Sequence, residues 1–286
     1  MRTEQVTSFQ NPKVKNLLLL QEKSSARRGQ GLFVVEGRRE LEHCLEAGYK
    51  VRTVFHCPEI APFSHSGLDC FSHSGLDCFS HSGLDCFSHS GLDPESLIIE
   101  IPAQLYRKMA YREGTEGIIA EVEAKHLSLN DLNLPENPLI VVLEAVEKPG
   151  NLGAVLRSAD AAGASAVIVC DPLTDLYNPN LIRASIGAVF TVPVVAVSSE
   201  EAIAFLKGRG IAILTAQLQD SSLYYDTDMR RGVAIVMGTE STGLTPAWRQ
   251  AADAHIRIPM LGRLDSLNVS VSAAILLFEA VRQRQI

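Results

Sequence analysis

Three polar, glycine-bearing segments in the second half of the chain carry the residue types that could do chemistry. EKPGNLGAVLRSADAAG (147–163) follows the apolar run LIVVLEAV, MGTESTGL (237–244) follows VAIV, and IPMLGRLDSLNVSVSAAILLFEA (258–280) comes last. Gly238 and Gly243 would let backbone amides approach a ligand closely. In α/β sheets, ligands collect beyond the carboxyl ends of strands, where backbone groups and helix N-termini are exposed. The segments therefore indicate a ligand site.

Each segment also has a plainer interpretation. Asn151 could cap a helix that carries Arg157 toward solvent, and the second segment could be any turn. Ser266 is well placed to cap the last helix, with Leu267 and Asn268 in its first turn. The chain has no GxGxxG after the first strand of this half, no GxxxxGK[ST] and no HExxH, and Ser266 has no nucleophile elbow. Dinucleotide, P-loop and metalloprotease interpretations therefore lose their usual support.

An eight-residue unit, CFSHSGLD, repeats almost letter for letter over residues 63–93 and brings histidines, cysteines and aspartates into register. CxxH pairs such as Cys70 and His73 make zinc chemically possible. In a uniform array, however, no one set of four ligands is favoured over the next as a tetrahedral site. Identity of the units down to the letter also indicates duplication of a DNA segment. We therefore expect a surface insert and no metal.

Composition indicates a globular protein of two domains, because the 286 residues are 46% apolar. No stretch approaches the roughly 18 to 20 apolar residues of a membrane span, and MRTEQVTSFQNPKVKN lacks the apolar core of a signal peptide. Outside the repeat, Cys44, Cys57 and Cys170 form no CxxC pair and suit buried, reduced thiols. We expect a cytoplasmic protein without a membrane partner.

Charge alone is ambiguous about nucleic acid. The net charge of −7 argues mildly against a phosphate-rich partner. The first thirty residues nevertheless hold six basic and two acidic residues, a local excess of four positive charges. Such a basic arm is compatible with RNA, and a solvated surface would explain it equally well.

The elements that must position the three segments belong to the second of two predicted domains. Residues 1–125 predict a small α/β domain, with helices over 10–31, 38–48 and 103–110 and strands over 32–37, 51–57, 97–101 and 117–124. HLSLNDLNLPENP (126–138) reads as a linker. In residues 139–286, Val/Ile/Leu runs, the last of them HIRIPM (255–260), alternate with helical stretches such as NPNLIRASIGAVF (178–190) and SEEAIAFLKGRG (199–210). This alternation indicates a parallel sheet covered by helices.

At NLGAVLRSA, MGTESTGL and IPMLGRLDSLNVSVSAA, the chain resembles the SpoU, or TrmH-like, RNA 2′-O-ribose methyltransferases of the SPOUT superfamily, with the three motifs in the right order and spacing. The N-terminal stretch from Thr7 to Gly48 is similar to the substrate-binding domain that precedes many of these catalytic domains. The resemblance covers nearly the whole chain except the insert. It implies a C-terminal trefoil knot, a rare exception among folds. It also implies a homodimer that uses S-adenosylmethionine to methylate a ribose 2′-hydroxyl of structured rRNA or tRNA.

The same resemblance implies roles for single residues. Around the cofactor it places Thr215, Ala216, Met237, Gly238, Ile258, Met260, Leu267 and Asn268, with Ile258 and Met260 against the adenine. Arg157 matches the family's catalytic arginine, and Asn151, Glu240, Ser266 and Asn268 would orient it and the substrate. Because an arginine is very hard to deprotonate, we expect Arg157 to grip a phosphate and stabilise the attacking oxygen, with a role as base left open.

One residue departs from the family pattern, and two other functions stay open. Thr239 stands where the second motif usually carries asparagine, so it keeps a hydroxyl and loses an amide. An RNA-binding or RNA-assembly protein could keep the fold without turnover. A nucleotide-dependent oxidoreductase would bind NAD in a titration where S-adenosylmethionine fails.

Cutting the insert back to one FSHSGLD unit should leave methylation intact, because one unit already makes an ordinary loop between the strands predicted at 51–57 and 97–101. The measurement is methyl transfer to RNA by the shortened and the full-length protein. A large loss of activity, or stoichiometric zinc in the purified full-length protein, would contradict this expectation.

Overall fold

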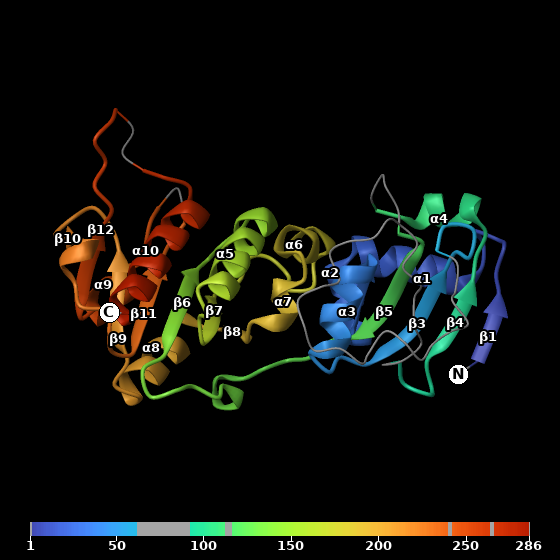
Figure 1. Cartoon of the computed structure of the whole chain (residues 1–286), viewed down its shortest axis with the longest axis horizontal. Helices are drawn as coiled ribbons and strands as arrows, with labels where there is room; N and C mark the ends of the chain where they lie inside the picture. The colour runs from blue at the N-terminus through green and yellow to red at the C-terminus, as the bar shows by residue number, and fades with distance from the viewer. Residues whose placement is uncertain (1, 62–91, 112–115, 240–241, 264–265, 286) are drawn as a thin grey trace. The chain divides into compact units, whose positions relative to one another are not determined.

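The computed structural model describes residues 2–61, 92–111, 116–239, 242–263 and 266–285. The chain divides into two compact units, Met1–Lys125 and His126–Ile286, each with its own sheet and helices (Figure 1). Residues 62–91, which hold most of the repeat, lie outside the described residues, and so does Glu240. The predicted behaviour of the insert and of Glu240 is therefore not described structurally.

The first unit is a mixed five-stranded sheet with helices, in the order β1-β4-β3-β5-β2. Its strands are β1 (Arg2–Gln5), β2 (Leu32–Glu36), β3 (Val51–His56), β4 (Leu97–Glu100) and β5 (Ile118–Glu123). Its helices are α1 (Pro12–Glu22), α2 (Ser24–Gln30), α3 (Arg38–Glu46) and α4 (Ala103–Met109). The repeat falls in the connection between β3 and β4, which are parallel neighbours with Thr53 opposite Leu97.

The basic N-terminal residues form folded elements instead of a free arm. Arg27 is 4% exposed and donates hydrogen bonds to the carbonyl oxygens of Leu20 (2.6 Å) and Gln21 (3.1 Å). These carbonyl oxygens lie in the last turn of α1 and have no partner within the helix. Lys13 forms an ion pair with Glu4. Two of the six basic residues of the predicted basic arm therefore already have partners within this unit.

The second unit confirms the predicted parallel sheet covered by helices. Its seven strands are all parallel, in the order β10-β12-β9-β11-β6-β7-β8. The strands are β6 (Leu139–Glu144), β7 (Ala166–Cys170), β8 (Val194–Val197), β9 (Ala212–Ala216), β10 (Ser222–Leu223), β11 (Val233–Met237) and β12 (Ala254–Arg257). The helices are α5 (Pro149–Ala161), α6 (Pro179–Ser185), α7 (Ala188–Thr191), α8 (Ser199–Gly208), α9 (Pro246–Ala251) and α10 (Val269–Arg284), with short 3-10 turns η1 (Leu129–Asp131) and η2 (Tyr224–Asp226).

Two helical layers cover this sheet. Helices α8 and α9 contact each other and β9, whereas α5 and α10 pack together, with α10 also against β6 and β11 (Figure 1). Alternation along the strands sends one set of apolar side chains to the α8 and α9 layer. That set packs around Leu206 and Trp248 and includes Ile140, Val142, Ile168, Ile213 and Val236.

Several predicted boundaries are corrected by local backbone chemistry. The helix predicted over 178–190 is two helices, because Ile186 and Gly187 take left-handed φ values of 52° and 84° between α6 and α7. The strand expected to reach Met260 ends at Arg257, close to Pro259, which has no N–H for a ladder bond. The short strands β1 and β10 were not predicted, since four and two residues are too few to show a period.

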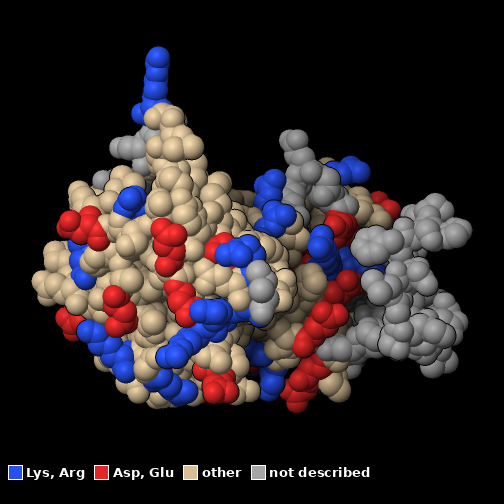
Figure 2. All heavy atoms as spheres, turned by 60° about the vertical axis from the view of Figure 1, so that its left-hand side comes forward, with Lys and Arg blue, Asp and Glu red and all other residues tan. Residues whose placement is uncertain are grey.

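Surface charge on the face shown in Figure 2 is mixed: lysine and arginine side chains lie among aspartates and glutamates. Within the described ranges, no helix has the length and apolarity needed to cross a bilayer. The cysteines of the described residues, Cys44, Cys57 and Cys170, are free and buried, as expected.

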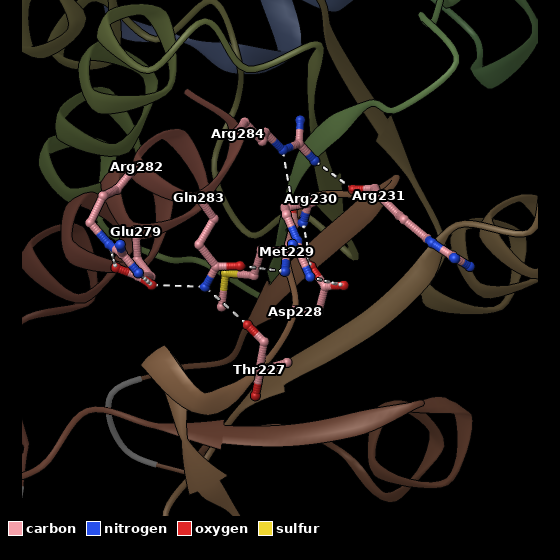
Figure 3. Close-up of polar contacts among 9 residues, drawn as sticks. All are labelled: Thr227, Asp228, Met229, Arg230, Arg231, Glu279, Arg282, Gln283 and Arg284. Atoms are coloured by element: carbon pink, nitrogen blue, oxygen red, sulfur yellow. Dashed lines mark hydrogen bonds and ion pairs between the residues drawn. The ribbon is translucent and has the colours of Figure 1, made fainter. Parts of the chain in front are cut away.

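The end of α10 is fastened to two loops by polar contacts, and Figure 3 shows those with the loop of residues 227–231. Arg284 donates to the carbonyl oxygens of Met229 (2.9 Å), Asn137 (3.0 Å), Pro138 (3.2 Å) and Arg231 (2.7 Å). Gln283 accepts from the backbone N–H of Met229 (2.8 Å) and donates to the Thr227 carbonyl (3.0 Å). These bonds hold the last helix against the loops that lead into β6 and β11.

Replacing Arg284 with alanine should lower the free energy of unfolding by about 1.5 to 3 kcal/mol, the usual range for hydrogen bonds to a charged group. Arg230→Ala is the matched control, because Arg230 and its ion-pair partner Asp228 are both exposed, and an exposed pair contributes roughly 0 to 1 kcal/mol. Denaturant unfolding measures both. Equal losses in the two variants would contradict the fastening role.

Candidate functional site

The carboxyl ends of β9, β11 and β12 meet at one edge of the parallel sheet and surround a hollow of about 400 Å³. The second and third segments (237–244 and 258–280) line it together with the chain that follows β9. The hollow is lined by Ala216, Gln217, Leu218, Gln219, Met237, Gly238, Thr239, Gly243, Leu244, Arg249, Ile256, Arg257, Ile258, Met260, Ser266, Leu267, Val269 and Ser272. Its volume lies in the range of small-molecule sites, and most of these side chains are apolar, as such sites require.

Six of the eight predicted cofactor residues line this hollow: Ala216, Met237, Gly238, Ile258, Met260 and Leu267. The other two, Thr215 and Asn268, are absent from its lining. Thr215 is fully buried in β9, where its Oγ1 lies 2.6 Å from Nδ1 of His255 in β12. It therefore joins two strands behind the wall of the hollow.

Asn268 joins the third segment to the first. Its Oδ1 accepts hydrogen bonds from the Ser270 backbone N–H (2.9 Å) and hydroxyl (2.6 Å), and its Nδ2 donates to Oδ1 of Asn151 (3.2 Å). Asn268 is thus the N-cap of α10, and the expectation that Ser266 caps this helix is wrong. The alternative that Asn151 caps α5 is also wrong, because Lys148 and Pro149 precede it at the start of that helix.

A second, smaller hollow of about 140 Å³ adjoins the first. It shares Gly238, Thr239 and Val269 with the larger one and is completed by Ala145, Val146, Glu147, Lys148 and Asn151. Asn151 therefore lines a space next to the main hollow. Two adjoining spaces that share lining residues would let two reactants lie side by side.

Arg157 lies apart from both hollows. It is exposed on α5 and belongs to neither lining. A helix turns by about 100° per residue, so a residue six positions beyond Asn151 lies on a different face. Within one copy of the described chain, the structure does not bring Arg157 to the residues that the resemblance groups with it.

Thr239, the residue that departs from the family pattern, uses its hydroxyl inside its own loop. Its Oγ1 accepts from the Thr242 backbone N–H (3.1 Å) and lies 2.7 Å from the Thr242 hydroxyl. The Gly243 backbone N–H donates to the Thr239 carbonyl oxygen (3.1 Å). The hydroxyl thus helps to shape the turn that forms the wall between the hollows.

Gly238 is needed where β11 leaves the sheet. A Cβ at this position would overlap the backbone carbonyl of Gly243 and lie 2.6 Å from the Leu244 nitrogen. The turn can therefore fold back on the strand end only if this residue has no side chain. Gly153 allows α5 to pack closely against α6, because a Cβ there would lie 2.5 Å from the Cβ of Ala184 in α6.

A buried carboxylate holds the far end of this turn. Glu144, the last residue of β6, is 3% exposed and accepts from the Thr245 backbone N–H (2.9 Å) and hydroxyl (2.6 Å). Ser199 donates to Asp171 (2.6 Å) and accepts from the indole N–H of Trp248 (3.0 Å), which extends the network under α9. Glu144 was not predicted, although one acid inside the run LIVVLEAV was a usable signal.

The buried thiol near this network is not a nucleophile. Burial, followed by the charges of Asp171 and Glu144, raises the pKa of Cys170 to about 12. Its thiol stays protonated at neutral pH, and only the thiolate attacks an electrophile.

The hollow fits the cofactor that the sequence resemblance implies. Ile258, Met260 and Leu267 offer apolar surface for a heterocycle, and Gly238 opens a close backbone approach. Gln217, which was also not predicted, places a buried side-chain oxygen in this lining without a hydrogen-bond partner among the described residues. An acceptor in this state is what a donor-bearing ligand would satisfy.

Comparisons with known proteins agree with this arrangement. Residues 138–278 match the SpoU rRNA Methylase family, and residues 11–120 match the MRM3-like substrate binding domain. A protein of Ralstonia nicotianae named 23S rRNA (guanosine-2′-O-)-methyltransferase RlmB is 37% identical over 193 residues, which span 65% of this chain and 78% of the relative.

Two solved structures are similar over almost the full length of both chains. One, described as an RNA 2′-O ribose methyltransferase, is 36% identical with a TM-score of 0.78 and covers 99% of this chain and 100% of its own. The other, an rRNA methyltransferase from Sinorhizobium meliloti with bound AdoMet, is 28% identical with a TM-score of 0.83 and covers 98% of each chain.

Replacing Gly238 with alanine should lower the free energy of unfolding by about 1 to 3 kcal/mol, the usual effect of overpacking, because the neighbouring atoms are backbone and cannot rotate away. Gly208→Ala is the control, since a Cβ there meets nothing within 4 Å and lies in helix α8. We expect Gly208→Ala to keep or raise stability. Thermal unfolding of both variants decides the matter, and equal stability would contradict the close approach at Gly238.

Proposed function

Since this chain belongs to the SpoU rRNA methylase family, we propose that its main hollow binds S-adenosylmethionine and that it methylates a ribose 2′-hydroxyl of ribosomal RNA. The chain is an RNA 2′-O-ribose methyltransferase. One observation carries the assignment of the site: three segments far apart in the sequence line one hollow and its neighbour at a single sheet edge.

The residues proposed for the cofactor act in two ways. Ile258 and Met260 would pack on the adenine, and Ala216, Met237, Gly238 and Leu267 would approach through backbone groups. Thr215 would support this wall through its contact with His255. The bound cofactor supplies an electrophilic methyl group.

The protein's task in the reaction is to place the ribose hydroxyl in line with that methyl group and to stabilise the oxygen as it loses its proton. Asn151 borders the smaller hollow, and Ser266 borders the larger one. Together with Asn268 and Glu240 they would orient the reacting groups. A guanidinium offers several N–H donors to phosphate and oxyanion oxygens, so we assign Arg157 to an RNA phosphate and to the developing negative charge on oxygen.

We propose a homodimer because α10 presents an apolar stripe to solvent. Val271 and Phe278 are each 47% exposed, and Ile275 lies between them at helical spacing. Exposed apolar surface of this kind marks association sites, and a second copy of this chain would cover it. Arg157 lies on α5, which packs against α10, so a second copy on this layer would lie near the arginine.

The trefoil knot is also a proposal. Strand β12 pairs with β9 beside the edge strand β10, and α10, which follows β12 in the chain, packs on β11, β6 and α5. This return of the chain from one side of β9 to the other supports our proposal that the last helix is threaded. The knot would bring all three segments to the same edge of the sheet.

The proposed substrate is a guanosine of the large-subunit ribosomal RNA, because the relatives that match most of this chain carry that activity in their names. The match of residues 11–120 to a substrate-binding domain supports the proposal that the first unit contacts the RNA. Structured RNA is recognised mainly by shape and by backbone contacts, which fits a chain of mixed surface charge. We place the enzyme in the cytoplasm, where ribosomal RNA is available.

Replacing Arg157 with alanine should lower methyl transfer by about 100-fold or more, the usual cost of removing one donor that stabilises a developing oxyanion, while S-adenosylmethionine still binds. The control is Arg183→Ala, another exposed arginine of the same unit. Transfer of labelled methyl groups to large-subunit rRNA and to tRNA measures activity, and calorimetry measures binding. Undiminished transfer by Arg157→Ala would refute its role, and methylation of tRNA alone would refute the proposed substrate.

A further inference from the structure

Gln217 presents a buried acceptor that nothing in its described surroundings satisfies. It follows the last residue of β9 and lines the main hollow. Its backbone N–H donates to the Ile256 carbonyl oxygen (3.0 Å), which fixes its position beside β12. Its Oε1 is buried and has no hydrogen-bond partner among the described residues.

The orientation of the amide follows from its other contact. Nε2 of Gln217 donates to the carbonyl oxygen of Gln219 (2.9 Å). Exchanging the two amide atoms would place two acceptors against each other, so the observed orientation is the one with a favourable contact. The oxygen is therefore the atom left for a ligand.

We propose that Gln217 is a cofactor-binding residue whose Oε1 accepts a hydrogen bond from S-adenosylmethionine. This inference rests on the proposed function of the hollow. The cofactor carries donors on its adenine amine, its ribose hydroxyls and its ammonium group. Several polar side chains belong to the lining, and Gln217 Oε1 is the buried oxygen among them that has no hydrogen-bond partner in the described part of the chain.

An unsatisfied buried acceptor destabilises the empty protein and becomes favourable only when a donor arrives. Removing it should therefore have opposite effects on stability and on binding. Substitution of a residue that only shapes the hollow would instead lower both stability and affinity. One experiment therefore distinguishes a ligand-binding role from a structural one.

The test is Gln217→Met, which keeps an unbranched side chain of similar length and removes the acceptor. It also removes the Nε2 bond to Gln219, which is exposed to water and therefore contributes little to stability. Calorimetric titration of the full-length protein with S-adenosylmethionine should show a dissociation constant about tenfold higher, the loss of one hydrogen bond. S-adenosylhomocysteine has the same three kinds of donor and should lose affinity equally. The unfolding temperature of the protein without cofactor should stay the same or rise.

Gln250→Met, at an exposed position of α9, is the control and should leave binding unchanged. If wild type and Gln217→Met bind equally well, the inference about Gln217 is wrong while the proposed function stands. If wild type binds no S-adenosylmethionine, the proposed function fails first. A lower unfolding temperature together with weaker binding would identify Gln217 as structural, and weaker binding of S-adenosylmethionine alone would point to its sulfonium charge instead of a hydrogen bond.

Discussion

The hydrogen bonds between Glu144 and Thr245 are the interaction on which the ligand-binding edge depends. A carboxylate at the end of a buried strand must find donors, and its two shortest hydrogen bonds come from Thr245 at the start of α9. The turn between Gly238 and Leu244 is therefore fixed at two ends, by strand β11 before it and by Glu144 after it. Because this turn is the wall common to both hollows, a buried contact that touches neither space sets the shape of both.

The wider arrangement follows from parallel pairing. Neighbouring parallel strands end at the same edge, so the loops after β6, β9, β11 and β12 are neighbours although long stretches of sequence separate them. The bond between Asn151 and Asn268 then links the first turn of α5 to the start of α10. The first and third segments thus fix each other, while the second lies between them. This edge is where we propose that RNA methyl transfer takes place.

Most of the fold was predictable from the sequence, because continuous apolar runs and helical spacing are strong signals over five or more residues. The apolar run at 139–146 and the helical stretch at 199–210 appear as β6 and α8. Shorter features escaped: β1 and β10 have no period to detect, and Asn268 instead of Ser266 caps α10 because the chain turns two residues later than expected. Gln217 and Glu144 could not be found by motif, since their importance comes from what surrounds them in space.

The strands at the two margins of the second sheet are short: β10 has two residues and β8 has four. An exposed margin with many unpaired N–H and C=O groups is a template for another chain, and shortening it removes the template. Short edge strands thereby disfavour edge-to-edge pairing into fibrils, in a unit whose interior is rich in β-branched residues. If this unit self-associates, we expect it to use its helical surfaces, because a helical interface is filled by one partner and offers no edge for further addition.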